Sequence, residues 1–330
     1  MLTGALPVRP LSPAQAAELR AAAASLLDRF SGLPAHPGLL TELPGTAAAL
    51  SDGVHAACRP ADTADGLFVL TGLEVDDAAL GPTPAHWSSA GDTAAVHDVV
   101  LLLLSAVMGV PLAWEGQQEG RYVHNIVPSP GHEEEQTGAS SSVLLSPHTE
   151  DAFHPGRAHL LLLSCLRNPD AVATTAASVR RVRLSDEDIR LLSRPELPIL
   201  PDDAYAEAQG YAGDPQPVPT LWRSPDGPTL RFDPAYTPLE RAGEEHRAAY
   251  ARLTDELSRV ATAVSLEPGQ VLVVDNDLVV HGRVPFKARY DGTDRWLKRS
   301  SVRVPGRRTR PSAERFEHGY GQKVLEAYDA

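Results

Sequence analysis

The amino-acid sequence predicts a mainly β fold with helical additions, of the antiparallel sandwich or jelly-roll type. From about residue 120 the chain consists largely of short apolar runs, each bounded by Pro, Gly, Asn or Asp, as expected of strands joined by turns. Few helical patterns separate these runs, whereas a parallel sheet would need a crossover helix between successive strands. The 29 prolines and 25 glycines also favour frequent turns over long helices.

The length of 330 residues allows either one large domain or two ordinary ones. No internal repeat or low-complexity linker divides the chain, and we therefore expect a single domain over residues 1–330. Within it we expect a helical scaffold at about 10–115, a jelly-roll core at about 116–305 and a C-terminal tail at 306–330.

Helices are expected mainly in the N-terminal part. Ser12 and Pro13 mark a helix start, because a capping hydroxyl precedes a proline at the first helical position, and AAELRAAAASLLDRF continues the pattern. Residues 31–65 show no clear period and are expected to be loop with short elements. A second helix is expected from about Thr93 to Met108; it is apolar nearly all round and therefore buried.

The later part of the chain supplies the strands and two further helices. The helical patterns are LSDEDIRLLS and the segment from Pro238 to Val264, where an apolar stripe lies between charges. The expected strands are RYVHNIV, SVLLS, HLLLLSCL, VATTAASV, QVLVVDN, DLVVHGRV and WLKRSSVRV.

Charge and composition exclude some partners. A net charge of −13 argues against nucleic acid or an anionic membrane, because both require clustered Lys and Arg. The basic stretch from Arg295 to Arg310 is expected to be a strand and exit loop with solvated charges, two of its arginines excepted. No segment has the length of a membrane span, no signal peptide is apparent, and Cys58 and Cys165 imply no disulfide framework. We therefore expect a cytoplasmic location; the sequence leaves the oligomeric state open.

Three residues suggest a metal site. His148 and Glu150 in SPHTEDAFHP lie two apart at the end of a β-type run, so their side chains project to the same face. His281, in DNDLVVHGRV, would complete a two-His-one-carboxylate triad, which is typical of non-haem Fe(II) oxygenases. An H-x-E pair alone is weak in a chain with 12 histidines, since a strand-end His beside a surface Glu looks the same. The ordered set, completed by Arg295, favours iron.

A 2-oxo acid co-substrate is suggested by Arg295, which follows His281 by fourteen residues. The guanidinium would hold the far carboxylate of 2-oxoglutarate through two parallel hydrogen bonds, with O2 as the second co-substrate. Thr174 or Thr175 could add a hydroxyl to the same carboxylate, although β propensity alone would also explain both threonines.

The segments HTEDAFHP, LLLLSCLRNPDAVATTAAS and DLVVHGR, together with Arg295, resemble the clavaminate synthase-like group of Fe(II)/2-oxoglutarate oxygenases over roughly residues 90–305. Within that group the chain is most similar to hydroxylases of free L-amino acids, of the type that act on arginine (as in the viomycin pathway), citrulline or asparagine. The resemblance implies a distorted double-stranded β-helix, a jelly roll with helical additions.

The resemblance also assigns residues to the amino-acid end of a substrate. The arginine that binds the substrate carboxylate in this group falls on Arg299, on the same strand face as Arg295. The glutamine that contacts the α-amino group falls on or near Gln117, and Glu150 is expected to approach the same amine.

At the side-chain end, arginine hydroxylases of this group use an aspartate pair. In LRFDPAY, Asp233 fits the first carboxylate, while Ala235 stands where the second is expected. Losing one carboxylate removes half of a guanidinium clamp, which puts the substrate in question. Asp202 or Asp203 could compensate, and Asp233 could instead only cap the turn before Pro234.

The sequence thus predicts hydroxylation of C3 or C4 of a free L-amino acid, with arginine or citrulline favoured, in peptide antibiotic biosynthesis. Desaturation, another polar substrate such as lysine, ornithine or asparagine, and a clavam-type precursor are alternatives. More remote ones are a cupin-type metalloenzyme, for which Arg295 has no use, and a silent jelly-roll binding module. His154 and His159 are expected to be structural.

Overall fold

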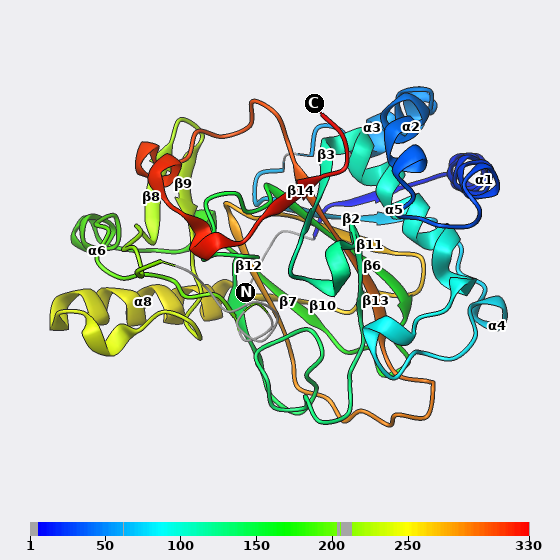
Figure 1. Ribbon diagram of the computed structural model, residues 1–330. Coiled ribbons are helices and arrows are strands. Elements are labelled where there is room, and N and C mark those ends of the chain that lie inside the picture. The colour runs from blue at the N-terminus through cyan, green and yellow to red at the C-terminus, as the bar shows by residue number, and fades with distance from the viewer. Residues whose placement is uncertain (1–5, 62, 203–204, 206–212, 330) are drawn as a thin grey trace.

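The computed structural model describes residues 6–61, 63–202, 205 and 213–329 and is rich in sheet, with helices on both sides (Figure 1). An eight-stranded and a four-stranded sheet carry most of the strands, and two strands form a separate hairpin. Every strand pair in the described residues is antiparallel except β1 with β2. The structure is therefore sheet-rich with helical additions, as predicted.

The larger sheet has the order β1 (Val8–Pro10), β2 (Leu67–Thr71), β11 (Val271–Asp275), β6 (Leu160–Arg167), β13 (Trp296–Arg303), β3 (Val110–Trp114) and β14 (Val324–Glu326), and β4 (Val123–Ile126) also pairs with β13. The smaller sheet has the order β10 (Thr262–Val264), β7 (Thr174–Ser178), β12 (Val279–Arg283) and β5 (Leu145–His148). The hairpin is β8 (Leu221–Ser224) with β9 (Gly227–Leu230). Strands β1, β2, β3 and β14 lie outside residues 116–305 and still join the larger sheet.

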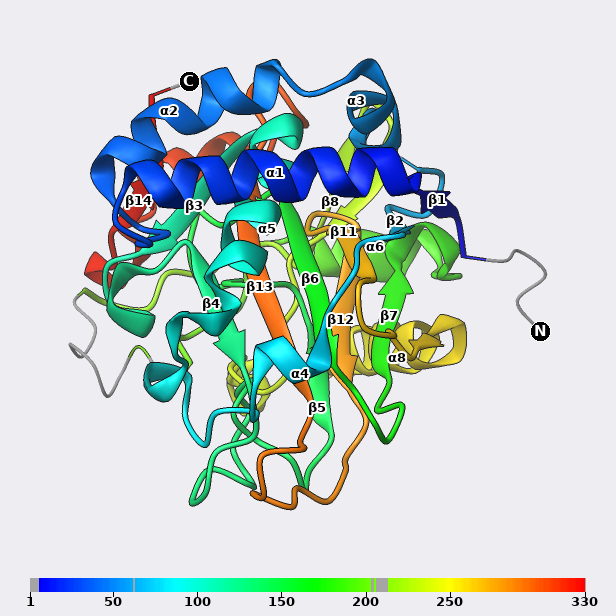
Figure 2. The same cartoon turned by 90° about the vertical axis from the view of Figure 1, so that its right-hand side faces the viewer.

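Helices cover the outer surfaces of the sheets (Figures 1 and 2). The α-helices are α1 (Pro13–Arg29), α2 (Pro37–Ala48), α3 (Asp52–Cys58), α4 (Asp77–Leu80), α5 (Ala95–Met108), α6 (Asp186–Leu192) and α8 (Glu244–Val260). Short 3-10 helices are η1 (Trp87–Ser89), η2 (Asp92–Ala94), η3 (Gln118–Gly120), η4 (Val179–Arg181), η5 (Leu239–Arg241), η6 (Ser312–Phe316) and η7 (Gly319–Gly321). None of the helices in the described ranges is both long enough and apolar enough to cross a membrane.

Strand β6, with the sequence LLLLSCLR, is mostly apolar because both of its faces are buried. Leu160 and Leu162 pack with the N-terminal helices, whereas Leu161, Leu163 and Cys165 pack into the core shared with the smaller sheet. Because successive residues of a strand point to opposite faces, a strand buried on both faces has apolar residues on both, and the small Ser164 is the one polar side chain inside the run. Strand β6 therefore lies between two hydrophobic cores, one on each of its faces.

The first helix begins as predicted, whereas residues 31–65, expected to be loop with short elements, contain more helix than that expectation allowed. Ser12 Oγ accepts a hydrogen bond from the Gln15 backbone N–H, and Gln15 Oε1 accepts one from the Ser12 N–H, which completes a capping box. The segment after α1 folds into α2 and α3 rather than loop. Pro44 lies inside α2 and obscures a buried face made of Leu39, Leu40, Leu43 and Ala47.

The smaller sheet places two histidines side by side. Strand β12 pairs with β5 so that His281 lies directly opposite His148. Side chains of directly opposed residues point to the same face of a sheet, so both imidazoles project together. Chain segments more than a hundred residues apart are thereby joined at one point.

Candidate metal centre and substrate pocket

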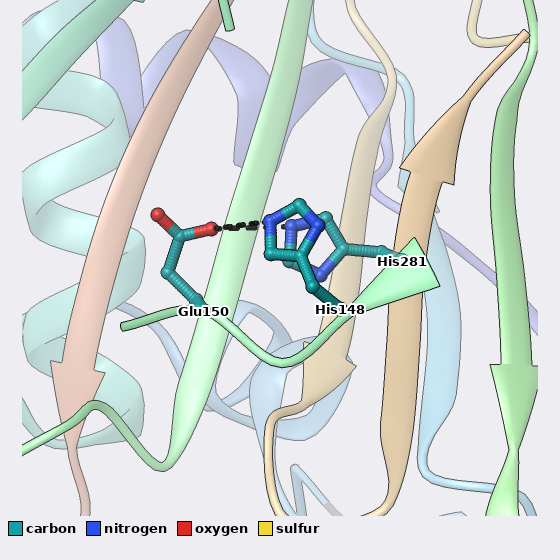
Figure 3. A group of neighbouring side chains, drawn as sticks. All are labelled: His148, Glu150 and His281. Carbon is teal, nitrogen blue, oxygen red and sulfur yellow. Dashed lines mark ion pairs between the residues drawn. The ribbon is translucent and has the colours of Figure 1, made fainter. Parts of the chain in front are cut away.

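Two imidazoles and one carboxylate converge at the end of β5 (Figure 3). The rings of His148 and His281 have centroids 4.6 Å apart. Glu150 Oε2 lies 3.2 Å from His281 Nε2 and 3.9 Å from His148 Nε2. One ligand atom from each residue falls within 4.8 Å of the others, so a single ion could contact all three.

The donor set fits a ferrous ion. His148 Nδ1 lies 2.8 Å from the Ser146 carbonyl oxygen, which leaves Nε2 as the ligand nitrogen, an arrangement common to metal-binding histidines. Glu150 and His281 are buried, whereas His148 is partly exposed. Two imidazole nitrogens and one carboxylate oxygen bind a metal from one side and leave its other positions open for small molecules.

Glu150 is held in its charged form. Burial alone raises the pKa of this carboxyl, but the guanidinium of Arg299 and the nearby His281 lower it well below its ordinary value. Arg299 Nη1 pairs directly with Glu150 Oε1. The other oxygen, Oε2, is the one that faces the two imidazoles.

Arg299 in turn is fixed by two side chains of the pocket. Its Nη2 donates to Gln117 Oε1 at 3.2 Å and lies 2.8 Å from His124 Nδ1. Burial lowers the pKa of His124 to about 3, so the imidazole is neutral and can accept from the guanidinium. The structure thus brings the predicted pair Gln117 and Arg299 together. His124 was missed, since nothing local distinguishes it from the other histidines of the sequence.

Arg295 is a buried cation of a different kind. It is 7% exposed, and its Nη2 donates to Thr174 Oγ1 at 3.0 Å. Its Nε is buried without a hydrogen-bond partner, and no carboxylate in the described part of the chain pairs with it. Burial lowers the pKa of Arg295 to about 10. A guanidinium in this state is suited to an anion that enters from outside the chain.

A cavity of about 450 Å³ connects these groups. Of the residues predicted for the site, it is lined by Gln117, His148, Glu150, Thr174, Asp202, Asp233, His281, Arg295 and Arg299. Thr175 is not among the lining residues; it follows Thr174 on β7, so its side chain points to the opposite face. Between the two threonines the geometry therefore favours Thr174. Asp203 lies outside the described residues.

Asp202 and Asp233 form an acidic part of this cavity. Asp233 Oδ1 accepts from the backbone N–H groups of Ala235 and Tyr236, at 3.1 and 3.4 Å, so it caps the turn and lines the cavity at once. Burial raises the pKa of Asp202 and of Asp233 to about 6 in each case. Repulsion from the Glu150 carboxylate adds to both shifts, and repulsion from Asp233 adds to that of Asp202. Within the described chain neither forms an ion pair with a cation.

The residues between and after the metal ligands were also missed. Thr149 N–H donates to the Phe232 carbonyl at 2.8 Å, and Thr149 Oγ1 accepts from Phe232 N–H at 3.0 Å, which ties the ligand loop to the segment that carries Asp233. Asp151 accepts from Trp114 Nε1 and from the Tyr205 hydroxyl, both at 2.7 Å. These are contacts between distant segments, and only the folded chain reveals them.

Two further histidines behave as expected of structural residues. His154 Nδ1 accepts from the Gly156 N–H at 2.8 Å, and His159 Nδ1 accepts from the Val304 N–H at 3.0 Å. Neither lines the cavity. Each therefore satisfies backbone groups near the site without facing it.

The chain is similar to several known proteins. The family described as taurine catabolism dioxygenase TauD, TfdA family, matches residues 104–301. An enduracididine beta-hydroxylase of Streptomyces hygroscopicus is 39% identical over 269 residues, which are 74% of this chain and 79% of that protein. Clavaminate synthase 2 of Streptomyces clavuligerus is 32% identical over 294 residues, 84% and 89% of the two chains. A crystal structure of the non-heme iron oxygenase OrfP with Fe, succinate and (3S)-hydroxy-L-Arg has a TM-score of 0.82 at 38% identity and covers 90% of this chain and 94% of that one.

The resemblance to clavaminate synthase-like oxygenases that the sequence predicted is thus confirmed. The alternatives of a cupin-type metalloenzyme and of a silent binding module find no support in these similarities. The family match spans more than half of the chain, and the solved structure of OrfP is similar over 90% of it. The chain therefore belongs to the TauD/TfdA family of dioxygenases.

Proposed function

We propose that this chain is an Fe(II)- and 2-oxoglutarate-dependent oxygenase that hydroxylates C3 or C4 of a free L-amino acid, with arginine or citrulline favoured, in peptide natural-product biosynthesis. One observation carries the proposal: a single cavity holds the two-His-one-carboxylate triad and the buried Arg295, for which the described chain offers no carboxylate. The single domain would be a distorted double-stranded β-helix, built from the two sheets.

His148, Glu150 and His281 would hold the iron. When bound, the iron supplies the activation of O2, so that 2-oxoglutarate becomes succinate and CO2 while one oxygen atom is inserted into a C–H bond of the amino acid. The residues of the chain supply position and exclusion of water. The cavity holds the reactants together at the triad, and the fixed charge of Glu150 keeps one metal ligand in place.

Arg295 and Thr174 would bind the far carboxylate of 2-oxoglutarate. A guanidinium can grip a carboxylate with two parallel hydrogen bonds, and the Thr174 hydroxyl already lies 3.0 Å from Arg295 Nη2. The incoming anion would also neutralise a cation that burial has made unfavourable. Because Arg295 and the triad line the same cavity, the other end of the co-substrate would reach the metal.

Arg299 and Gln117 would bind the amino-acid end of the substrate. Arg299 uses three of its five N–H donors on Glu150, Gln117 and His124, which leaves two for a carboxylate. Gln117 lines the same cavity and presents an amide near the expected position of the α-amino group. The α-carbon would then lie close to the metal centre, as hydroxylation at C3 or C4 requires.

Asp202 and Asp233 would bind the far end of the side chain. Their raised pKa values, caused first by burial, show that the cavity does not itself neutralise them. A cationic side chain such as that of arginine would do so, and Asp202 would stand in for the second carboxylate that Ala235 lacks. The neighbour OrfP was solved with (3S)-hydroxy-L-Arg, which supports a guanidinium substrate.

The test is incubation of the protein with Fe(II), ascorbate, 2-oxoglutarate and a pool of the standard L-amino acids plus citrulline and ornithine. We expect iron-dependent succinate, and by mass spectrometry a gain of one oxygen atom on one member of the pool. The variant His148→Ala should give neither product. Loss of two hydrogens instead would indicate desaturation, and wild-type protein that releases no iron-dependent succinate would contradict the proposal.

The pH dependence of KM should distinguish a cationic from a neutral side chain. The pKa values of Asp202 and Asp233 are about 6, so both carboxyls are largely neutral at pH 5.5 and ionised at pH 7.5. Ionisation favours a guanidinium, and KM for arginine should therefore fall by roughly 4- to 15-fold over that interval, depending on whether one or both charges are needed. The measurement is the ratio of KM for arginine to KM for citrulline, which cancels pH effects on the metal ligands. A ratio that does not change with pH would argue against these carboxylates as the side-chain site.

A further inference from the structure

Asn276 contacts the metal-ligand loop through its side chain. It directly follows Asp275, the last residue of β11, in the turn 276–278 that leads to β12, and it is fully buried. Its Oδ1 accepts from the Glu150 N–H at 2.7 Å, and its Nδ2 donates to the Glu150 carbonyl at 2.9 Å. The same Nδ2 also donates to the Ala158 carbonyl at 3.2 Å. One amide therefore satisfies both backbone polar groups of the carboxylate ligand.

The need for such a contact follows from where Glu150 lies. Strand β5 ends at His148, so Glu150 has passed the edge of the sheet and has no neighbouring strand to pair with. The next residue, Asp151, has a φ of +51°, which turns the chain sharply directly after the ligand. The backbone N–H and C=O of Glu150 are bonded by a side chain instead, and Asn276 takes the place of a strand partner.

We propose that Asn276 is a positioning residue that fixes the backbone of Glu150, and so sets the affinity of the site for its metal. The inference rests on the proposed function, since it assigns Glu150 as a ligand. Arg299 orients the carboxylate, and Asn276 holds the peptide unit from which that carboxylate extends. The two contacts together leave Oε2 aimed at the histidines.

The C-terminal tail holds the turn that carries Asn276. Arg308 Nη1 pairs with Asp275 at 3.0 Å, and Arg310 pairs with Asp277 at 3.0 Å. Arg310 Nη2 also donates to the Ala158 carbonyl at 2.9 Å, the same oxygen that Asn276 uses. The turn, the tail and the segment after Glu150 therefore meet at one buried junction.

This junction corrects an expectation about the basic stretch that ends at Arg310. Its charges were expected to be solvated, but the side chains of Arg308 and Arg310 are only 5% and 10% exposed. The acidic partners lie on a turn that is distant in the sequence, and the run of arginines gives no sign of them. The tail is thus part of the support for the metal site.

The test compares Asn276→Ala with Asn168→Ala as a matched control. Asn168 also uses its amide on the backbone: it accepts from Val172 N–H at 2.9 Å and donates to the carbonyls of Val172 and Leu266 at 3.1 and 3.0 Å. It makes the same number of such bonds, but none of them is to the backbone of a metal ligand. Both variants should lower the melting temperature, because each loses three hydrogen bonds to the backbone. A loss of metal affinity in Asn276→Ala alone would then be a specific effect and not a result of lower stability.

The readout is Co(II) binding to the 2-oxoglutarate-free protein, measured by calorimetry and by the visible absorption of the bound ion. Loss of a residue that orients a metal ligand typically weakens binding about 10- to 100-fold. We expect that loss and a changed Co(II) spectrum for Asn276→Ala, and an unchanged affinity and spectrum for Asn168→Ala. The isosteric variant Asn276→Asp, which keeps the acceptor and removes the donor, should also weaken binding and serves if the alanine variant does not fold.

The possible failures are distinguishable. Wild-type protein that binds neither Co(II) nor Fe(II) would refute the proposed function itself. Wild-type protein that binds Co(II), with Asn276→Ala and Asn276→Asp of equal affinity and spectrum, would overturn the role of Asn276 alone. An equal loss of affinity in Asn168→Ala would show a general structural effect and would also overturn it.

Discussion

Replacing Glu150 by glutamine should abolish iron-dependent succinate release and also destabilise the fold. Glutamine keeps the size of the side chain but removes the charge that both the metal and Arg299 require. Arg299 forms a buried ion pair with Glu150, and removal of one partner of such a pair costs about 3–5 kcal/mol because it leaves the other charge uncompensated. We expect the free energy of unfolding, measured with urea, to fall by about 3 kcal/mol.

The matched control for this variant is Glu314→Gln. Glu314 makes a two-point ion pair with the buried Arg157, at 2.9 and 3.0 Å, away from the cavity. Its loss should lower stability by a similar amount while Fe(II) binding and turnover persist. Glu150→Gln with wild-type turnover would be incompatible with the assigned ligand set.

The sequence predicted those parts of the site that depend only on the spacing of residues along a strand. His148 and Glu150 share a face because they lie two residues apart on an extended chain, and Arg295 and Arg299 share one because they lie four apart. To place His281 beside them, the prediction had to assume that two strands distant in the sequence are neighbours. The pairing of β12 with β5 fulfils that assumption. The spacing of residues on a strand thus predicts which side chains point to the same face of the sheet.

What could not be predicted depends on register and on contacts between distant segments. Thr174 and Thr175 are equivalent in sequence, and only the pairing of β7 with β12 decides which of them faces the cavity. His124 and Asn276 reach their partners across 175 and 126 residues, distances over which a single sequence gives no signal. Helix α2 was missed for a local reason, because Pro44 interrupts an otherwise periodic apolar face.

Replacing Arg295 by methionine should remove 2-oxoglutarate binding and leave the ligand-free protein more stable than wild type. The pKa of Arg295 falls from its ordinary 12.5 to about 10 because of burial, so the charge costs the folded state about 3 kcal/mol at neutral pH. Methionine removes that cost and forfeits the hydrogen bond to Thr174, worth about 1–2 kcal/mol. The two charge-assisted bonds to 2-oxoglutarate are lost as well, which should weaken its binding by at least about 100-fold.

The measurement is the melting temperature with and without 2-oxoglutarate, in the presence of Mn(II) and without O2. Wild-type protein should gain stability on adding 2-oxoglutarate, and Arg295→Met should start higher and gain nothing. Arg283→Met is the control: burial lowers the pKa of Arg283 to about 10 too, but its guanidinium donates to Ser140 Oγ and the Val143 carbonyl at 3.1 and 3.2 Å. That variant should be less stable than wild type, because loop acceptors lose their donors. If 2-oxoglutarate stabilises Arg295→Met as much as wild type, Arg295 is not the residue that binds the co-substrate. A higher melting temperature together with lost binding would mean that Arg295 destabilises the ligand-free protein and is needed to bind 2-oxoglutarate.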